Sequence, residues 1–239
     1  RWADEIVLVD MHSEDKTRAI AETFGCRVLL HRRTGYVEPA RKFAVDSATH
    51  DWVLVVDADE RVSSGLADWI RKQPDTPVAN GFRLPRRNYY GERWMKCCGW
   101  FPDAQLRFYH RQHASYSDRI HRGLTIEGKI ETIPAYGEAY LSHMCFDSLE
   151  DRFGKLNSYS GISAKGLASE GRSVGAVGLI GRTFLAFARA YFLQQGWRAG
   201  GVGAVLALER GMDTYLKYAK IWECARQSPK DHAQIPEKG

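Results

Sequence analysis

Apolar runs of strand length alternate with helical stripes through the first part of the chain. The runs lie at residues 5–9, 27–30 and 52–56, and each is followed by a stretch with apolar positions at helical spacing. This β-α-β-α-β-α order with short connections is typical of a parallel α/β sheet covered by helices. A break rich in proline at residues 74–77 ends the pattern.

A different pattern follows the break. Further strands are expected at residues 81–84, 105–109, 124–133 (with a turn at Gly128) and 139–143. The sequence then reads as helical from Asp147 to near Gln227, and ends in a polar tail. The predicted organisation is an α/β domain over residues 1–146, a helical extension over residues 147–228 and a tail over residues 229–239.

Small polar residues, glycine and proline mark the expected ends of the first helices. Ser13 is a good N-cap for the first helix, and Gly25 ends it. Pro39 suits the first turn of the second helix. Ser63, or the serine after it, can cap the third.

Carboxylates stand at the carboxyl ends of two of these strands. Asp10 ends the first, and Asp57, Asp59 and Glu60 follow the third. Because parallel strands end at one edge of a sheet, where ligands bind, these groups are expected to share a site. Carboxylate oxygens suit Mg²⁺ or Mn²⁺, and the N–H groups of a helix starting at Ser13 suit polar ligand atoms. The alternative is an acidic turn that starts the next helix.

Composition narrows the class of protein. Hydrophobic residues make up 44% of the 239 residues, which supports a real core. The net charge of +5 suggests an anionic partner, but it is too small to single out nucleic acid. Five cysteines without a metal-binding spacing indicate reduced thiols. No apolar run reaches the roughly 20 residues that span a bilayer. The chain starts at Arg1 and leads at once into a strand, as if within a domain.

Residues 82–122 combine basic and aromatic side chains. Arginine can grip phosphate and aromatic rings can stack on sugars, so the segment suits a sugar and phosphate site. A solvated basic face and a nucleic-acid surface are the alternatives. Within the segment, Asp103 has aromatic neighbours that would raise its pKa toward that of a general base, although it also fits an ordinary loop aspartate. His121 and His143 are candidates for acceptor or phosphate contacts, or are structural histidines.

The C-terminal part holds two apolar stretches, at residues 174–193 and 202–221, each interrupted by charges. This pattern is typical of amphipathic helices that pack on a domain or lie at a membrane surface. No nucleophile elbow, Walker loop or His-Glu-x-x-His motif occurs, which disfavours hydrolases, P-loop ATPases and zincins.

Four segments together resemble family 2 glycosyltransferases, and most closely the lipopolysaccharide core β-glucosyltransferase branch. They read DEIVLVDMHSEDKT from residue 4, VEPARKFA from residue 37, DWVLVVDADERV from residue 51 and GWFPDAQLRF from residue 99. The likeness covers most of the chain, including KYAKIWE from residue 217. It implies a GT-A (Rossmann-like) fold with a mostly parallel sheet, a mixed acceptor-side region and C-terminal helices.

The resemblance also implies roles for individual residues. Asp10, Arg41 and Asp57 would bind the nucleotide, and Asp59 would hold the metal, Mg²⁺ or Mn²⁺. Asp103 would be the catalytic base. The acceptor or diphosphate side would be lined by Gln105, Arg107 and His121.

The chain departs from the family pattern in three places. The family's first strand, with its nucleotide-contacting loop, is absent before Ile6, so the domain is shortened at its N-terminus. Lys42 stands where the family usually has Asn, and Met11-His12 replaces the commoner Ser-Gly. Neither substitution removes a carboxylate.

The expected activity is an inverting transfer of a hexose from a nucleotide sugar, UDP-glucose in the nearest branch. The acceptor would be the lipopolysaccharide core or another lipid-linked glycan, reached from the cytoplasm by an enzyme peripheral on a bacterial inner membrane. A polyprenyl-phosphate sugar transferase, and a non-catalytic membrane-peripheral binding module that keeps the sheet without its first strand, are the alternatives. A nucleic-acid partner is not expected.

Overall fold

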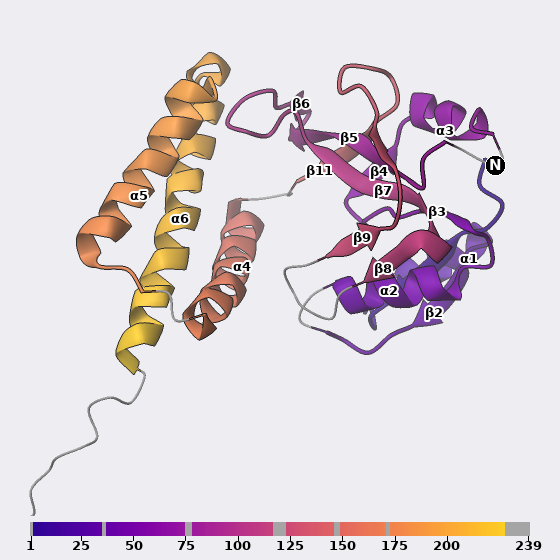
Figure 1. Cartoon of the computed structure of the whole chain (residues 1–239), viewed down its shortest axis with the longest axis horizontal. Helices are drawn as coiled ribbons and strands as arrows, with labels where there is room; N and C mark the ends of the chain where they lie inside the picture. The colour runs from indigo at the N-terminus through magenta and orange to yellow at the C-terminus, as the bar shows by residue number, and fades with distance from the viewer. Residues whose placement is uncertain are drawn as a thin grey trace, which may run out of the picture. The chain divides into compact units, whose positions relative to one another are not determined.

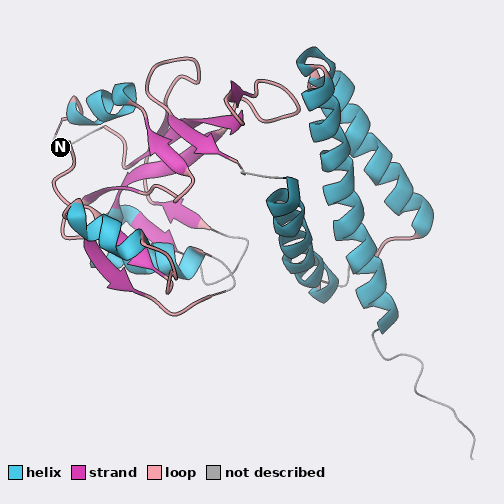
Figure 2. Ribbon diagram, turned by 180° about the vertical axis from the view of Figure 1, so that it is seen from behind, coloured by secondary structure: helices cyan, strands magenta, loops and turns pink. Residues whose placement is uncertain are grey.

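The computed structural model describes residues 2–34, 37–74, 78–116, 123–145, 149–170 and 173–227. The chain divides into two compact units, an α/β unit and a helical unit (Figures 1 and 2). The α/β unit comprises Arg1–Arg87 and Pro102–His143, and the helical unit comprises Asn88–Phe101 and Met144–Gly239. The segment at 88–101 therefore belongs with the C-terminal helices.

The α/β unit begins with a parallel strand pair. β1 (Val7–Asp10) pairs with β2 (Arg27–Leu30), and α1 (Thr17–Thr23) connects them. Gly25 has a φ of 68° just after this helix, a conformation that residues with a Cβ adopt at a cost. The predicted strand–helix–strand start is confirmed, although the helix begins at Thr17 and its N-cap position is Lys16 rather than Ser13.

The main sheet of this unit has the strand order β3-β7-β5-β11-β4, and β10 also pairs with β5. The bounds are β3 Trp52–Leu54, β4 Glu60–Val62, β5 Gly81–Tyr90, β7 Ala104–His110, β10 Ile130–Thr132 and β11 Leu141–Met144. β7 runs antiparallel to both β3 and β5, and β11 antiparallel to β4. Parallel pairing is found between β1 and β2 and between β10 and β5. The parallel pairing expected from the sequence is found between β1 and β2, whereas the main sheet is mixed, with antiparallel pairing of β7 to β3 and β5.

Two helices accompany the sheet. α2 (Glu38–Ser47) carries Pro39 in its first turn, as predicted, and packs against β1. α3 (Ser64–Arg71) is capped by Ser63, whose Oγ accepts a hydrogen bond from the backbone N–H of Leu66 at 3.1 Å. The cap satisfies one of the free N–H groups at the helix start.

The core of the α/β unit lies where α3 meets the sheet. Leu66 from α3 packs with Phe82 and Leu84 of β5 and with Phe108 of β7, and Trp69 closes the cluster from the same helix. Burial of each of these large side chains contributes about 1.5–3 kcal/mol. This core fixes β5 and β7 side by side, and both strands carry candidate site residues.

The predicted strand over residues 124–133 is two strands. β9 (Leu124–Ile126) pairs with β8 (Ala114–Tyr116), whereas β10 pairs with β5. Gly128 separates them with a φ of 95°, and the side chain of Asn80 lies where a Cβ would stand. The turn expected at Gly128 is confirmed, but its two strands have different partners.

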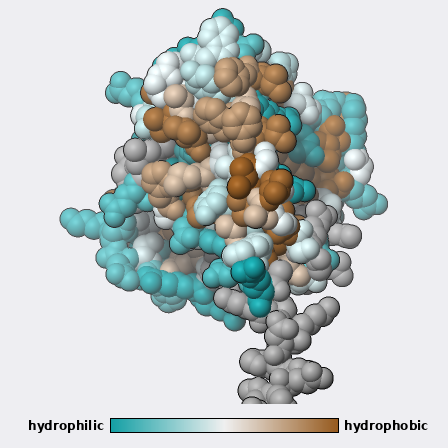
Figure 3. Space-filling model, turned by 90° about the vertical axis from the view of Figure 1, so that its left-hand side faces the viewer, coloured by the Kyte–Doolittle hydropathy of each residue, from teal (hydrophilic) through white to brown (hydrophobic). Residues whose placement is uncertain are grey.

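Helices make up most of the second unit. Their bounds are α4 Leu149–Ser169, α5 Ala176–Ala188, η2 Arg189–Leu193, η3 Gly196–Ala199 and α6 Gly201–Gln227. α6 lies between α4 and α5 and contacts both (Figure 1). Apolar side chains gather on the side shown in Figure 3. The predicted helical stretch to near Gln227 is confirmed.

The unit boundary differs from the predicted division at residue 146. The segment 88–101 contributes Met95, Cys97 and Cys98, all buried, to a cluster with helical residues including Ala190 and Leu206. β6 (Arg93–Trp94) also pairs within this segment, with the end of β5. Because Ala190 and Leu206 stand far along the chain from Cys98, local periodicity does not reveal where these apolar residues pack.

Candidate active site

The turn after β3 holds a carboxylate between two guanidinium groups. Arg41 of α2 places its Nη2 2.7 Å from Oδ1 and 2.6 Å from Oδ2 of Asp57. Arg107 of β7 donates to the same Oδ2. Burial works to raise the pKa of Asp57, but the hydrogen bonds and charges of Arg41 and Arg107 outweigh it, so the pKa lies below its ordinary value. Asp57 is therefore an anion committed to these two arginines.

Glu60 is the buried centre of the same cluster. Its side chain is fully enclosed, and Oε1 accepts from Nη2 of Arg107 at 3.0 Å and from Nη1 of Arg86 at 3.2 Å. Its other oxygen accepts the backbone N–H of Asp57 at 3.0 Å, and its own N–H donates to the carbonyl of Asp57. Glu60 thus bonds back to the backbone of Asp57 within the acidic turn, and it orients the guanidinium groups of Arg86 and Arg107. Two charge-assisted bonds and a backbone bond satisfy the buried carboxylate.

Arg86 of β5 connects Glu60 with Asp103. Its Nε lies 2.8 Å from Oδ2 of Asp103, and its backbone N–H donates to the carbonyl of Asp103 at 2.7 Å. Gln105 holds the other oxygen, Oδ1, at 2.6 Å. Burial works to lower the pKa of Arg86, but the ion pairs with Asp103 and Glu60 raise it above its ordinary value. The guanidinium therefore stays charged beside the candidate base.

These side chains form one alternating line of charges, which we call the charged row. Its members, in order of contact, are Arg41, Asp57, Arg107, Glu60, Arg86 and Asp103. Cations and anions are equal in number, so the row carries no net charge. It joins α2, the acidic turn, β5 and β7 through hydrogen-bonded ion pairs, which fixes the positions of the acidic turn and the Asp103 loop.

Asp59 lies outside this row and is the most exposed of the candidate carboxylates in the turn. Its side chain is 41% exposed, and Nε2 of His143 on β11 lies 3.4 Å from Oδ2. In the part of the chain that is described, no group of three His, Cys, Asp or Glu side chains could hold a metal ion. Mg²⁺ typically binds one or two carboxylates and completes its shell with substrate phosphates and water. Asp59 fits that mode, and the residues present do not fit a closed protein cage.

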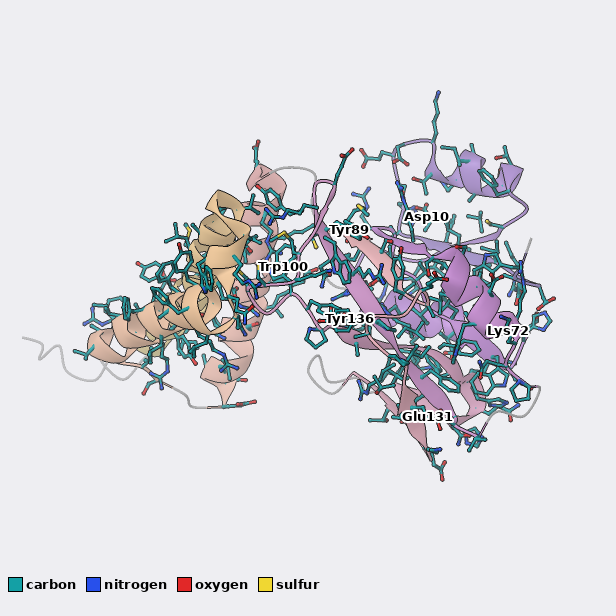
Figure 4. The ribbon with its side chains drawn as sticks, turned by 90° about the horizontal axis from the view of Figure 1, so that it is seen from above. Asp10, Lys72, Tyr89, Trp100, Glu131 and Tyr136 are labelled. Atoms are coloured by element: carbon teal, nitrogen blue, oxygen red, sulfur yellow. The ribbon has the colours of Figure 1, made fainter. Side chains whose placement is uncertain are left out.

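Asp10 makes local contacts at the end of β1 (Figure 4). Its two oxygens accept the backbone N–H of Ser13 at 3.0 and 3.2 Å, and Nε of Arg18 lies 3.5 Å away. The bonds from Ser13 and the charge of Arg18 hold the pKa of Asp10 below its ordinary value, against the effect of burial. The prediction that Ser13 caps the helix is wrong, because Ser13 donates its own N–H to Asp10 and α1 begins at Thr17.

The structure brings together part of the predicted set. Arg41, Asp57, Asp103, Gln105 and Arg107 meet in or beside the charged row. α2 relates them to Asp10, since it packs against β1 and carries Arg41. His121 lies outside the described residues.

Two further observations refine this set. The side chain of Arg107 is only 8% exposed and pairs with two carboxylates, so it supports the site from within. The sequence pattern groups Glu60 with the carboxylates of the acidic turn but gives it no role of its own, and within the basic segment it does not single out Arg86. The signal for Glu60 was its place in the acidic turn, but nothing in the pattern around Arg86 distinguishes it from the exposed Arg83 on the same strand.

Comparison with known proteins shows what the chain is similar to. Residues 3–115, which contain the whole charged row, match the family model described as Glycosyl transferase family 2. The match supports a family 2 glycosyltransferase. The α/β fold of the GT-A type expected from the four segments is thereby confirmed, together with the C-terminal helices.

Curated relatives agree with this assignment over nearly the whole chain. An uncharacterized glycosyltransferase of Rickettsia bellii is 29% identical over 94% of this chain and 79% of its own length. The lipopolysaccharide core biosynthesis glycosyltransferase LpsC of Rhizobium meliloti is 26% identical over 92% of this chain and 83% of its own. Among solved structures, Staphylococcus aureus TarS (residues 1–349) is 13% identical with a TM-score of 0.43, over 93% of this chain and 82% of that one.

Proposed function

We propose that this family 2 glycosyltransferase moves a hexose, with inversion, from a nucleotide sugar to a lipopolysaccharide-core or other lipid-linked acceptor. UDP-glucose is the proposed donor. The observation that carries the proposal is the charged row, which ties the acidic turn to the Asp103 loop. A transferase needs its donor and its base in fixed relation, and the row supplies that rigidity. The LpsC relative supports the lipopolysaccharide acceptor.

Asp103 is the proposed base. The acceptor hydroxyl oxygen forms a bond to the anomeric carbon while the bond from that carbon to the diphosphate oxygen breaks. The diphosphate leaves with the electron pair, and the hydroxyl proton passes to Asp103. Arg86 donates to Oδ2 of Asp103 and Gln105 donates to Oδ1, and these two bonds hold the carboxylate in position. One displacement inverts the anomeric centre, so no covalent intermediate is needed.

Asp59 would hold Mg²⁺ or Mn²⁺ through its exposed carboxylate. A divalent cation there would neutralise charge on the departing diphosphate. Arg41 would lie beside the nucleotide, and Asp57 would act on the donor by orienting that guanidinium. Asp10 would contact the nucleobase of the donor, and the backbone N–H of Ser13 already holds its carboxylate in position.

Gln105 would face the diphosphate or acceptor side, steadied by its bond to Asp103. His121 is proposed for the same side. A lipid-linked acceptor would bring the enzyme to the cytoplasmic face of a bacterial inner membrane, as a peripheral protein. The same donor site would also suit a polyprenyl-phosphate sugar transferase. That enzyme is the alternative to a lipopolysaccharide-core transferase.

The test measures donor binding and turnover separately. Calorimetry with UDP-glucose, with and without Mn²⁺, is run on the wild type, Asp59→Asn and Asp103→Asn. Asp59→Asn should lose the Mn²⁺-dependent part of the affinity. Asp103→Asn should keep donor binding and lose about 10²–10⁴-fold in turnover on a lipid-linked acceptor. Asp68→Asn, an exposed acid on α3, is the matched control for the loss of one carboxylate.

Three results would contradict the proposal. Unchanged Mn²⁺-dependent affinity in Asp59→Asn would remove the metal role. Tight UDP-glucose binding by the wild type, without release of UDP on any lipid-linked acceptor, would favour the non-catalytic binding module. Strongly salt-dependent binding to RNA, with indifference to UDP-glucose, would favour a nucleic-acid protein instead.

A further inference from the structure

α5 and η2 expose large apolar side chains to solvent. Each of the following is more than 60% exposed: Val177, Ile180, Phe184, Leu185, Phe192 and Leu193. α5 lies on the side of the helical unit that Figure 3 faces, and apolar residues gather there. We call this set the apolar face. A continuous exposed apolar surface of this kind marks a binding site more often than chance.

The charges around the apolar face have one sign. The described residues 173–208 contain Arg182, Arg189 and Arg198, all exposed, and no Asp or Glu. Arg182 and Arg189 stand seven residues apart, which is two helical turns, so they lie on the same flank of the helix. The whole chain carries 34 basic and 29 acidic residues, so a stretch this long with no acid is a local feature.

We infer that the apolar face docks on the surface of an anionic lipid bilayer, with α5 and η2 lying in the plane of the headgroups. The apolar side chains would enter the boundary between headgroups and acyl chains, and the arginines would meet lipid phosphates. The inference extends the proposed membrane location, because it names the surface that makes the contact.

A position on the bilayer fits the structure better than a span across it. The stretch Ala176–Leu193 is apolar and long enough to cross a membrane, with a mean hydropathy of 1.3 and 6% of it buried. However, α5 packs along α6, where a Cβ on Gly211 would lie 3.4 Å from the carbonyl oxygen of Thr183. α6 carries Glu209, Arg210 and Asp213 at this level, and a spanning α5 would draw those charges toward hydrocarbon.

The short helix after η2 carries side chains suited to an interface. Trp197 is exposed, and the guanidinium carbon of Arg198 lies 5.9 Å from its ring centroid. The guanidinium of Arg182 likewise lies 5.1 Å from the ring centroid of Tyr218 on α6. Trp and Tyr prefer the headgroup level, where their rings are half buried and their polar groups stay wet.

A second copy of the chain fits this surface poorly. In a twofold symmetric dimer the same surface meets itself, so the surface that carries Arg182, Arg189 and Arg198 would meet another of the same sign. No acidic side chain within residues 173–208 would offset the repulsion. Anionic lipid offers the opposite charge and an apolar layer together, which matches both features of the face.

The experiment is vesicle co-sedimentation without donor or acceptor, so its outcome does not depend on the transferase reaction. The wild type is mixed with phosphatidylcholine vesicles containing about 30% phosphatidylglycerol, an anionic content that attracts basic segments, and with pure phosphatidylcholine vesicles. Two double variants are compared, Ile180→Gln with Phe184→Gln, and Arg182→Gln with Arg189→Gln. Val78→Gln is the control, because Val78 is 80% exposed and lies in the α/β unit.

Wild type and Val78→Gln should bind the anionic vesicles equally. The Ile180/Phe184 variant should lose on the order of tenfold or more in binding, because its inserted apolar area is gone. Each arginine replaced should cost about fivefold on anionic vesicles and little on neutral ones. Wild type left in the supernatant, or an Ile180/Phe184 variant that binds like wild type, would overturn the inference. Dimerisation abolished by the same variant, without vesicle binding, would assign the face to a second copy.

Discussion

Glu60 holds the charged row together, because it alone in the row bonds to two arginines and to the backbone of the acidic turn. Replacing Glu60 by Gln keeps the shape of the side chain and removes its charge. We expect the free energy of unfolding to fall by about 2–3 kcal/mol, since two buried charge-assisted bonds are weakened. Urea unfolding measures the change. Glu92→Gln, at an exposed position, should change the stability little, and equal effects at the two sites would contradict the assigned role.

Asp57 predicts how stability depends on pH. Its folded-state pKa lies below the ordinary value of 3.8, because the bonds and charges of Arg41 and Arg107 outweigh burial. The stabilisation is therefore fully present above that ordinary value and is lost as the pH falls through the folded-state pKa. Unfolding of the wild type and Asp57→Asn, measured from neutral to acid pH, should show a stability difference that shrinks below about pH 4. A difference that stayed constant through the acid range would contradict the paired anion.

At the scale of the element, β5 presents its arginines in different ways. Arg83 is exposed, whereas Arg86 joins Glu60 to Asp103. Arg86→Gln should keep donor binding and lower kcat by about 10²-fold, because a small displacement of the base is costly. It should also shift the acidic limb of the pH–rate profile upward, since Asp103 loses its cationic neighbour. Arg83→Gln on the same strand is the matched control. An unchanged pH profile with a lower kcat would reduce Arg86 to a purely structural role.

The elements also show what the sequence could and could not predict. The strand at residues 27–30 and the Ser63 cap follow from local chemistry, and both were predicted at their observed positions. Strand direction was not predictable, because an apolar run reads alike whichever way its neighbour runs. Ile20 and Phe24 have helical spacing and yet are exposed. Periodicity predicts which residues share a helix face, but it does not predict whether another element covers that face. The pairing of Arg86 with Asp103 depends on β5 and β7 lying together, which only the fold establishes.

At the scale of the whole molecule, the segment 88–101 leaves the α/β unit and returns to it after packing among the C-terminal helices. The helical unit is therefore built from two separate parts of the chain, one of which is inserted within the α/β unit in the sequence. Cys97 and Cys98 are buried there, and burial, with the neighbouring thiol, raises the pKa of Cys98 to about 12. Thiolate is the reactive form of cysteine, so these two side chains should be inert while the helices remain in place.

This burial predicts the outcome of thiol labelling. In the native protein an aromatic disulfide reagent should modify Cys26 and Cys224, which are partly exposed, before Cys97, Cys98 and Cys145. A fragment that ends at residue 143 keeps Cys97 and Cys98 but lacks the helices against which they pack, so both should react quickly. Mass spectrometry of the labelled peptides assigns each site, and Cys26, which lies in the α/β unit, is the internal control for the reagent. Slow labelling of Cys97 and Cys98 in a fragment whose Cys26 reacts as in the native protein would mean that the segment 88–101 stays packed without the helices. In that case the boundary between the α/β unit and the helical unit would lie near residue 146, as the sequence pattern predicts.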